Sequence, residues 1–370
     1  MKVLILTCNT GGGHNSAARA VKSSLVNRGV EVEVRDAIAY ISKGTSKLVS
    51  KGHIVLYQKF PKLIAKGYEF EENHPPKDGK PSNLYDIFSL GAQKLYKELL
   101  SGRYQAVICT HVFGALTITA IKKKYAYPIK SYFIATDYSC SLGVSDTDMD
   151  GYFIPHKDLI EEFVENGVPE EKIIPSGIPV RLDFYKKRLK IEAKKELYLR
   201  PDKRIVLLMG GSMGAGPIKD MAMKLSEELP QDCMLVAICA SNDKLRNELH
   251  KSGCQNIRII GYTSKMDVFM DAADLIITKP GGLTTTEIAV KQVPAIFVNA
   301  VMGCETSNMQ FFEKKGYSYG TDDINELVKI ANRLLSEPES VKSIKEALNK
   351  TFPKYAPETI SDYVLEDCKR

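Results

Sequence analysis

Several features are absent from this sequence of 370 residues, and these absences exclude some classes of protein. It has no tryptophan, and its eight cysteines form no Cys-x-x-Cys pair and no histidine spacing typical of zinc. We therefore expect reduced thiols in a cytosolic protein and no metal site built on them. No apolar run approaches the roughly 20 residues that a membrane-spanning helix needs. Met1-Lys2 leads directly into a strand pattern, so we expect no signal peptide.

Acidic residues are missing from the long stretch between Asp36 and Glu69. Apolar side chains are interspersed there with six lysines: Lys43, Lys47, Lys51, Lys59, Lys62 and Lys66. Basic segments that also carry apolar side chains are typical of proteins that lie on anionic membranes. The net charge of +6 agrees with that reading. The lysines are thus predicted to face a membrane; the alternative is a solvated helix face over an ordinary core.

The length suits two domains rather than one core, and 44% apolar with 26% charged residues is typical of a soluble globular chain. Glycine and proline punctuate residues 176–180, which we expect to form the hinge. The predicted domains are residues 1–176 and residues 177–370, with helices at the end of the second.

Strand patterns alternate with helical patterns in both halves. In the first half they lie near 2–8, 31–35, 105–110, 130–135, 151–154 and 172–175, and in the second near 204–209, 233–239, 257–260, 274–278 and 294–298. Strands separated by helices imply parallel sheets with right-handed crossovers. The predicted fold class is α/β with two Rossmann-like domains.

The most informative segment is Lys279–Glu287, which follows the apolar run Asp274–Thr278 and opens an amphipathic helix near Thr284. Glycines at 281 and 282 allow a ligand to approach the backbone, and a helix N-terminus attracts phosphate. Glu287 is suitably placed for the hydroxyls of a nucleotide ribose. The alternative is a capping box of Thr284 and Glu287.

The same order of strand, glycines and helix occurs twice more. Residues 2–7 precede Gly11-Gly12-Gly13-His14, and residues 204–209 precede the loop Gly210–Gly216. Ligands of parallel α/β sheets bind beyond the carboxyl ends of the strands. Two such sheets facing one cleft would therefore place a nucleotide-linked donor opposite an acceptor.

These motifs, taken in order, resemble those of the inverting GT-B glycosyltransferases. That family includes monogalactosyldiacylglycerol synthases, processive diacylglycerol glucosyltransferases and the peptidoglycan glucosaminyltransferase. The resemblance covers almost the whole chain. The matching segments are Thr10–His14 with Ser16-Ala17-Ala18, Thr136-Asp137, Gly167-Val168-Pro169, Ser176–Val180, Gly210–Pro217, Lys279–Glu287 and Gly303-x-Glu305-x-x-Asn308.

The resemblance implies a UDP-hexose donor, held mainly by the second domain without a metal or other cofactor. Tyr262 would pack on the uracil, with the Thr263 backbone reading its edge, although a core or rim tyrosine is the alternative. Glu287 would bind the ribose and Glu305 the hexose or ribose. The full set of predicted donor-binding residues is Gly12, Gly13, Ser212, Met213, Gly214, Tyr262, Thr263, Pro280, Gly281, Gly282, Leu283, Thr284, Glu287, Glu305 and Asn308.

Inversion requires a base that removes the proton of the acceptor hydroxyl. His14 follows the first glycine run and ionises in a suitable range, so we expect it to be this base. Asp137 is the second candidate, either as the base or as the group that orients it. The alternatives are a phosphate or loop contact for His14 and a turn cap for Asp137.

Two departures from the family pattern leave the sugar and the acceptor open. The glycolipid synthases usually carry His and Trp shortly after Thr-Asp, whereas Tyr138–Gly143 follow here. Cys304 stands where Gln is usual. The acidic triplet Asp146-x-Asp148-x-Asp150 is interpreted as a solvated turn rather than a cation site.

Parts of the sequence are also consistent with three other functions. Gly210-x-Ser212-x-Gly214 has the form of a hydrolase elbow, but only His250 follows it, in a charged helical stretch. A UDP-sugar epimerase and a nucleotide- or lipid-binding module without catalysis also stay open.

The predicted activity is transfer of a hexose, with inversion, from a UDP-sugar to a lipid hydroxyl, and we expect diacylglycerol as the acceptor. The predicted location is the inner face of the cell membrane, with an anionic surface and no nucleic acid as partner. Processivity and oligomeric state are not predicted.

Overall fold

The computed structural model describes the chain apart from residues 10–11, 42–81, 211–216, 255, 302 and 370. The chain divides into two compact units. The first comprises Met1–Leu182, Met302–Cys304 and Pro353–Arg370, and the second comprises Asp183–Val301 and Glu305–Phe352. In the part of the chain that the structure describes, each unit has its own sheet of six parallel strands, so the predicted pair of Rossmann-like folds is confirmed. A shared cleft stays a prediction.

The first sheet has the strand order β2-β1-β3-β4-β5-β6. Its strands are β1 (Lys2–Thr7), β2 (Glu31–Asp36), β3 (Ala106–Cys109), β4 (Lys130–Ile134), β5 (Gly151–Phe153) and β6 (Ile173–Ile174). Among the described residues, the helices of this unit are α1 (Gly12–Val26), α4 (Asn83–Ser89), α5 (Ala92–Gly102), α6 (Val112–Tyr125), α7 (Ile160–Glu165) and α16 (Ala356–Asp367). Short 3-10 turns lie at Ala37–Tyr40, Val144–Asp146, Lys157–Leu159 and Glu170–Lys172.

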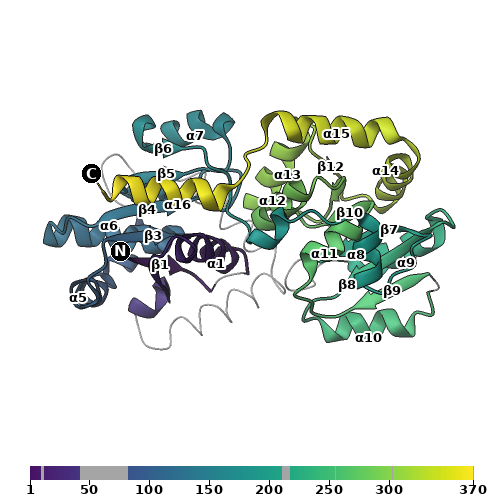
Figure 1. Cartoon of the computed structure of the whole chain (residues 1–370), viewed down its shortest axis with the longest axis horizontal. Coiled ribbons are helices and arrows are strands. Elements are labelled where there is room, and N and C mark those ends of the chain that lie inside the picture. The colour runs from purple at the N-terminus through teal and green to yellow at the C-terminus, as the bar shows by residue number, and fades with distance from the viewer. Residues whose placement is uncertain (10–11, 42–81, 211–216, 255, 302, 370) are drawn as a thin grey trace. The chain divides into compact units, whose positions relative to one another are not determined.

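The last helix of the chain, α16, belongs to the first unit (Figure 1). Ile360 and Val364 are fully buried in the cluster that also contains Val21 of α1. The Tyr132 hydroxyl donates to the Asp367 carboxylate over 2.7 Å. The predicted assignment of residues 177–370 to one domain therefore needs correction, since burial of the apolar face of α16 requires the sheet of the first unit.

The second sheet has the order β12-β11-β10-β7-β8-β9. Its strands are β7 (Arg204–Met209), β8 (Cys233–Ile238), β9 (Ile257–Ile260), β10 (Leu275–Thr278), β11 (Ala295–Phe297) and β12 (Tyr319–Gly320). Its helices are α8 (Lys190–Glu196), α9 (Ile218–Glu228), α10 (Asp243–Lys251), α11 (Met266–Ala272), α12 (Gly282–Lys291), α13 (Cys304–Lys314), α14 (Ile324–Ser336) and α15 (Pro338–Thr351), with a 3-10 turn at Leu182–Tyr185 at the junction of the units.

Each strand order contains one point where the direction of winding reverses. In the first sheet this point lies between β1 and β3, and in the second between β7 and β10. At both points the two neighbouring strands are parallel, so their carboxyl ends emerge side by side. Thr278 pairs with Met209, so Lys279 and Gly210 leave the second sheet together. These are the positions at which such sheets bind ligands.

Among the helices that the structure describes, none is both long enough and apolar enough to cross a membrane.

Candidate active site

His14 lies at the switch point of the first sheet. It is the third residue of α1 and is partly buried. Its Nδ1 atom lies 2.9 Å from the carbonyl oxygen of Thr110, just beyond β3, and 3.0 Å from the hydroxyl of Thr136, just beyond β4. The Thr110 hydroxyl in turn donates to the His14 carbonyl over 3.2 Å. Two segments that are distant from His14 in sequence, at Thr110 and Thr136, therefore hold this imidazole.

These contacts determine which nitrogen of His14 carries the proton. A carbonyl oxygen only accepts, so Nδ1 must donate to Thr110, and the neutral ring then has its lone pair on Nε2. The Thr136 hydroxyl, 3.0 Å from the same nitrogen, is left to accept from it. A neutral imidazole with a fixed Nδ1–H and a basic Nε2 is the form in which histidine acts as a general base.

A second histidine beside His14 was not predicted. His111 precedes α6, and its Nδ1 accepts the Phe113 backbone N–H over 3.2 Å. The neutral ring of His111 therefore has its proton on Nε2, the opposite tautomer to that of His14. The ring centroids of the two histidines are 4.5 Å apart, edge to face. The available signal was a histidine two residues after the apolar run 106–109.

Asp137 follows Thr136 beyond the carboxyl end of β4 and is partly buried. Its neighbour Thr136 contacts His14. Whether Asp137 or His14 is the base stays a prediction. Gly12 and Gly13, also predicted for the donor, begin α1, with Gly12 exposed.

The acidic triplet at 146–150 is distributed over separate partners. Asp146 accepts the Ser82 backbone N–H, Asp148 pairs with Lys172 at 3.0 Å, and Asp150 pairs with Lys122 at 2.7 Å. These carboxylates therefore have structural roles. Across the described residues no group of three or more His, Cys, Asp or Glu could hold a metal ion.

In the second unit, the helix of the central motif begins earlier than predicted. Gly281 is the N-cap of α12, with φ −67° and ψ 137°, and the first helical residue is Gly282. Thr284 is thus inside the first turn and Glu287 lies beyond it, so the capping-box alternative is wrong. Glycine has no side chain with which to cap the first N–H groups, so a ligand can approach this helix end.

The loop before α12 has room on its outer side. A Cβ atom placed on Gly281 would have no heavy atom within 4 Å in the described structure, and its φ is one that any residue adopts. Neither backbone conformation nor packing therefore requires glycine here. Close approach of a ligand to the backbone is a reason that remains.

The first turn of α13 contacts the same loop. Lys279 Nζ lies 3.0 Å from Glu305 Oε2, and the backbone N–H of Val301 donates to that oxygen over 2.8 Å. Asn308, fully buried, donates from Nδ2 to the Pro280 carbonyl over 2.9 Å. The structure thus brings Glu305 and Asn308 to the loop, together with Lys279, which was not predicted as a site residue.

The remaining predicted donor residues differ in exposure. Tyr262, after β9, is 81% exposed, so the alternative of a core tyrosine is wrong. Thr263 and Glu287 are partly buried, whereas the Leu283 side chain is buried in the unit. Ser212, Met213 and Gly214, and the six lysines at 43–66, lie outside the described residues.

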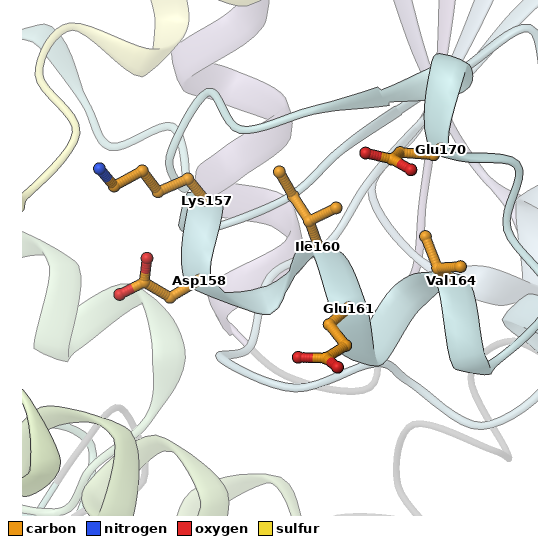
Figure 2. A pocket seen from close by; sticks show the side chains of 6 residues that line it. All are labelled: Lys157, Asp158, Ile160, Glu161, Val164 and Glu170. Atoms are coloured by element: carbon orange, nitrogen blue, oxygen red, sulfur yellow. The ribbon is translucent and has the colours of Figure 1, made fainter.

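A separate open pocket of about 390 Å³ lies on the first unit (Figure 2). Charged side chains surround Ile160 and Val164 there, and the lining residues are Lys157, Asp158, Ile160, Glu161, Val164 and Glu170. Most of these side chains are exposed. No residue of a predicted motif lines it, so we assign it no part in the site.

Each unit has an element that is typical of nucleotide-dependent transferases: a histidine held at the switch point of the first sheet, and a glycine-rich helix start at that of the second. Residues 14–180 match the family model of monogalactosyldiacylglycerol (MGDG) synthase. Residues 205–358 match that of the glycosyltransferase family 28 C-terminal domain. The protein belongs to the glycosyltransferases that these two models describe, and the resemblance predicted from its motifs is confirmed.

Individual proteins agree with this family. A processive diacylglycerol beta-glucosyltransferase of Bacillus cytotoxicus is 27% identical over 385 residues, covering 99% of this chain and 94% of the relative. The crystal structure of MurG from Acinetobacter baumannii matches with a TM-score of 0.63 at 16% identity, covering 99% of both chains. UDP-GlcNAc 2-epimerase from Neisseria meningitidis, bound to UDP-GlcNAc, matches with a TM-score of 0.62 at 15% identity over 99% of both chains. The last two show the fold alone.

Proposed function

We propose that this glycosyltransferase moves a hexose, with inversion, from a UDP-sugar to a lipid hydroxyl, with diacylglycerol as the acceptor. The observation that carries the proposal is the pairing of a base-form His14 with an open glycine loop at Lys279–Gly282, each at the switch point of its sheet. Full-length similarity to a diacylglycerol glucosyltransferase supports the choice of substrates.

On the donor side, the second unit binds UDP. The N-terminus of α12 and Gly281 receive the diphosphate, while Glu287 binds the ribose hydroxyls. The highly exposed Tyr262 provides a ring for the uracil. Glu305 binds hexose hydroxyls. No metal takes part in this proposal, because the positive helix end faces the departing diphosphate, so activity is expected to survive EDTA.

On the acceptor side, His14 removes the proton of the lipid hydroxyl as that oxygen attacks the anomeric carbon. Nε2 is the accepting atom, because Nδ1 donates to Thr110. Asp137 is the alternative base. Comparison of His14→Ala with Asp137→Ala separates the two.

The enzyme works on the inner face of the cell membrane in this proposal, with the lysines at 43–66 on anionic lipid. Flotation with vesicles tests this part directly. We expect binding to vesicles that contain an anionic lipid and much weaker binding to neutral ones. Equal binding to both would remove the electrostatic contribution.

Product analysis tests the whole proposal. Purified protein is incubated with labelled UDP-glucose, UDP-galactose and UDP-N-acetylglucosamine, each with and without diacylglycerol vesicles. A labelled glycolipid that forms only with vesicles is the expected result. Conversion of a UDP-sugar without any acceptor would favour an epimerase, whose fold is shared. UDP binding without conversion would favour a binding module.

A further inference from the structure

Lys279 and Glu305 form an ion pair at the switch point of the second sheet, where a diphosphate is expected to bind. The lysine suits such a ligand, whereas the glutamate has the same sign of charge as the diphosphate. Lys279 is the first residue after β10, and its side chain is only 15% exposed. Its Nζ atom is 3.0 Å from Glu305 Oε2. A carboxylate in this position repels an incoming diphosphate unless its charge is balanced.

The side chain of Glu305 is more constrained than that of Lys279. Glu305 lies in the first turn of α13, and the same Oε2 accepts the Val301 backbone N–H over 2.8 Å. The carboxylate therefore retains a bond when Lys279 leaves. Lys279 has a flexible stem with a compact charge that can change partner, and it directly precedes Pro280 and the open Gly281. Movement of Lys279 is thus the easier change.

We infer that Lys279 and Glu305 exchange partners when the donor binds. Lys279 leaves Glu305 for the diphosphate, and Glu305, still held by Val301, accepts hydroxyl groups of the hexose. A diphosphate with two negative charges attracts the ammonium more strongly than one carboxylate does. This inference rests on the proposed UDP-sugar donor and assigns Lys279 the stabilisation of the leaving group.

The chemical step explains why a movable lysine would help catalysis. The bond between the hexose C1 and the β-phosphate oxygen breaks, and its electron pair stays on UDP. A bond forms between C1 and the acceptor oxygen, whose proton passes to the base. Because the β-phosphate gains negative charge as the bond breaks, a cation beside it binds the transition state more tightly than the donor.

The test is a double-mutant cycle on nucleotide binding, with full-length Lys279→Met, Glu305→Gln and the double variant. Calorimetry is run with UDP and with uridine, which lacks the phosphates. We expect Lys279→Met to weaken UDP binding by tenfold or more and to leave uridine binding unchanged. Glu305→Gln is expected to strengthen UDP binding several-fold, because it removes the competing carboxylate, while lowering kcat. The double variant should bind UDP more weakly than the wild type, because it lacks the lysine, but more tightly than Lys279→Met, because it also lacks the repelling carboxylate.

A matched control comes from the other end of the same strand. Lys190 pairs with Asp274, directly before β10, so Lys190→Met removes a paired lysine away from the site. It should bind UDP as the wild type does.

Three results would overturn the exchange. One is UDP binding by Lys279→Met equal to that of the wild type. Another is equal weakening in both single variants and no further change in the double, which indicates a purely structural pair. If the wild type binds neither UDP nor uridine, the proposed donor itself is wrong and the exchange is rejected with it.

Discussion

The Nδ1 atom of His14 lies 2.9 Å from the carbonyl oxygen of Thr110. This contact connects the first turn of α1 to the residue that follows β3, at the switch point of the first sheet. Since the carbonyl oxygen accepts, the imidazole is fixed with its basic atom at Nε2. A backbone group thereby does for His14 what a buried carboxylate does in other enzymes: it selects the tautomer and orients the ring.

Replacement of His14 is expected to remove the base without removing the donor site. We expect His14→Ala to lower kcat by about 10²–10⁴-fold, the usual contribution of a general base, with UDP affinity nearly unchanged. Single-turnover kinetics and calorimetry measure the two quantities. His250→Ala is the control, because His250 is exposed in the last turn of α10. Near-normal turnover in His14→Ala, with loss in Asp137→Ala, would make Asp137 the base.

Thr136 is expected to position His14 and not to take part in proton transfer itself. Its hydroxyl is 3.0 Å from Nδ1. Loss of one such hydrogen bond is worth about 1 kcal/mol, or roughly fivefold in rate. Thr136→Val should therefore lower kcat by about that factor with little change in KM, and Thr136→Ser should restore it. A serine variant as slow as the valine variant would contradict this role.

The strands were predictable because a parallel strand buried on both faces appears in sequence as one apolar run. Residues 204–209 and 275–278 are of this kind. The two-residue strand β12 was missed, since two residues carry no pattern. The packing of α16 on the first sheet was missed because it depends on contacts with residues more than two hundred positions away.

The site was predictable only one motif at a time. The glycine runs and the acids at 287 and 305 follow recognisable strand ends. The contact between His14 and Thr110 requires β1 and β3 to be neighbours, which strand order decides. The ion pair of Lys279 with Glu305 likewise depends on the placement of α13. The start of α12 was misjudged because Thr284 resembles a cap, whereas Gly281 has the extended backbone of the actual one.

Gly281 is expected to tolerate a side chain in the free protein but not in the complex. A Cβ there meets open space, so Gly281→Ala should change stability by less than about 1 kcal/mol, the scale of N-cap effects. UDP affinity should fall by tenfold or more, because the methyl group blocks close approach to the backbone. Gly281→Ser separates the two effects, since serine caps well but is at least as bulky. Normal UDP affinity in both variants would place the diphosphate elsewhere.

Lys291 is expected to matter for folding rather than for catalysis. Its side chain is 1% exposed, and its ammonium pairs with Asp271 at 2.7 Å and donates to the Lys186 carbonyl. Removing one member of a buried ion pair costs about 3–5 kcal/mol. Arg188, which also contacts Asp271, offsets part of that loss, so we expect about 3 kcal/mol for Lys291→Met in denaturant unfolding. Lys329→Met, at an exposed pair, should cost less than about 1 kcal/mol.

Asp150 is expected to make folding of the first unit sensitive to acid. Burial alone raises the pKa of its carboxyl. Lys122 and the hydroxyl and N–H of Ser131 lower this pKa by more than burial raises it, so it lies below the ordinary value. A carboxyl with a depressed folded-state pKa stabilises the protein above its unfolded pKa of about 4, and that contribution disappears as the pH falls through the folded-state pKa. Asp150→Asn should therefore be less stable than the wild type at pH 7, and the difference should shrink below about pH 4.

Urea unfolding of the wild type and Asp150→Asn from pH 7 to pH 3 measures this difference in stability. Asp202→Asn, which removes one partner of an exposed ion pair, is the control. A difference that stays constant over the whole range would mean that the charge of Asp150 contributes nothing, and that only its hydrogen-bonding shape matters.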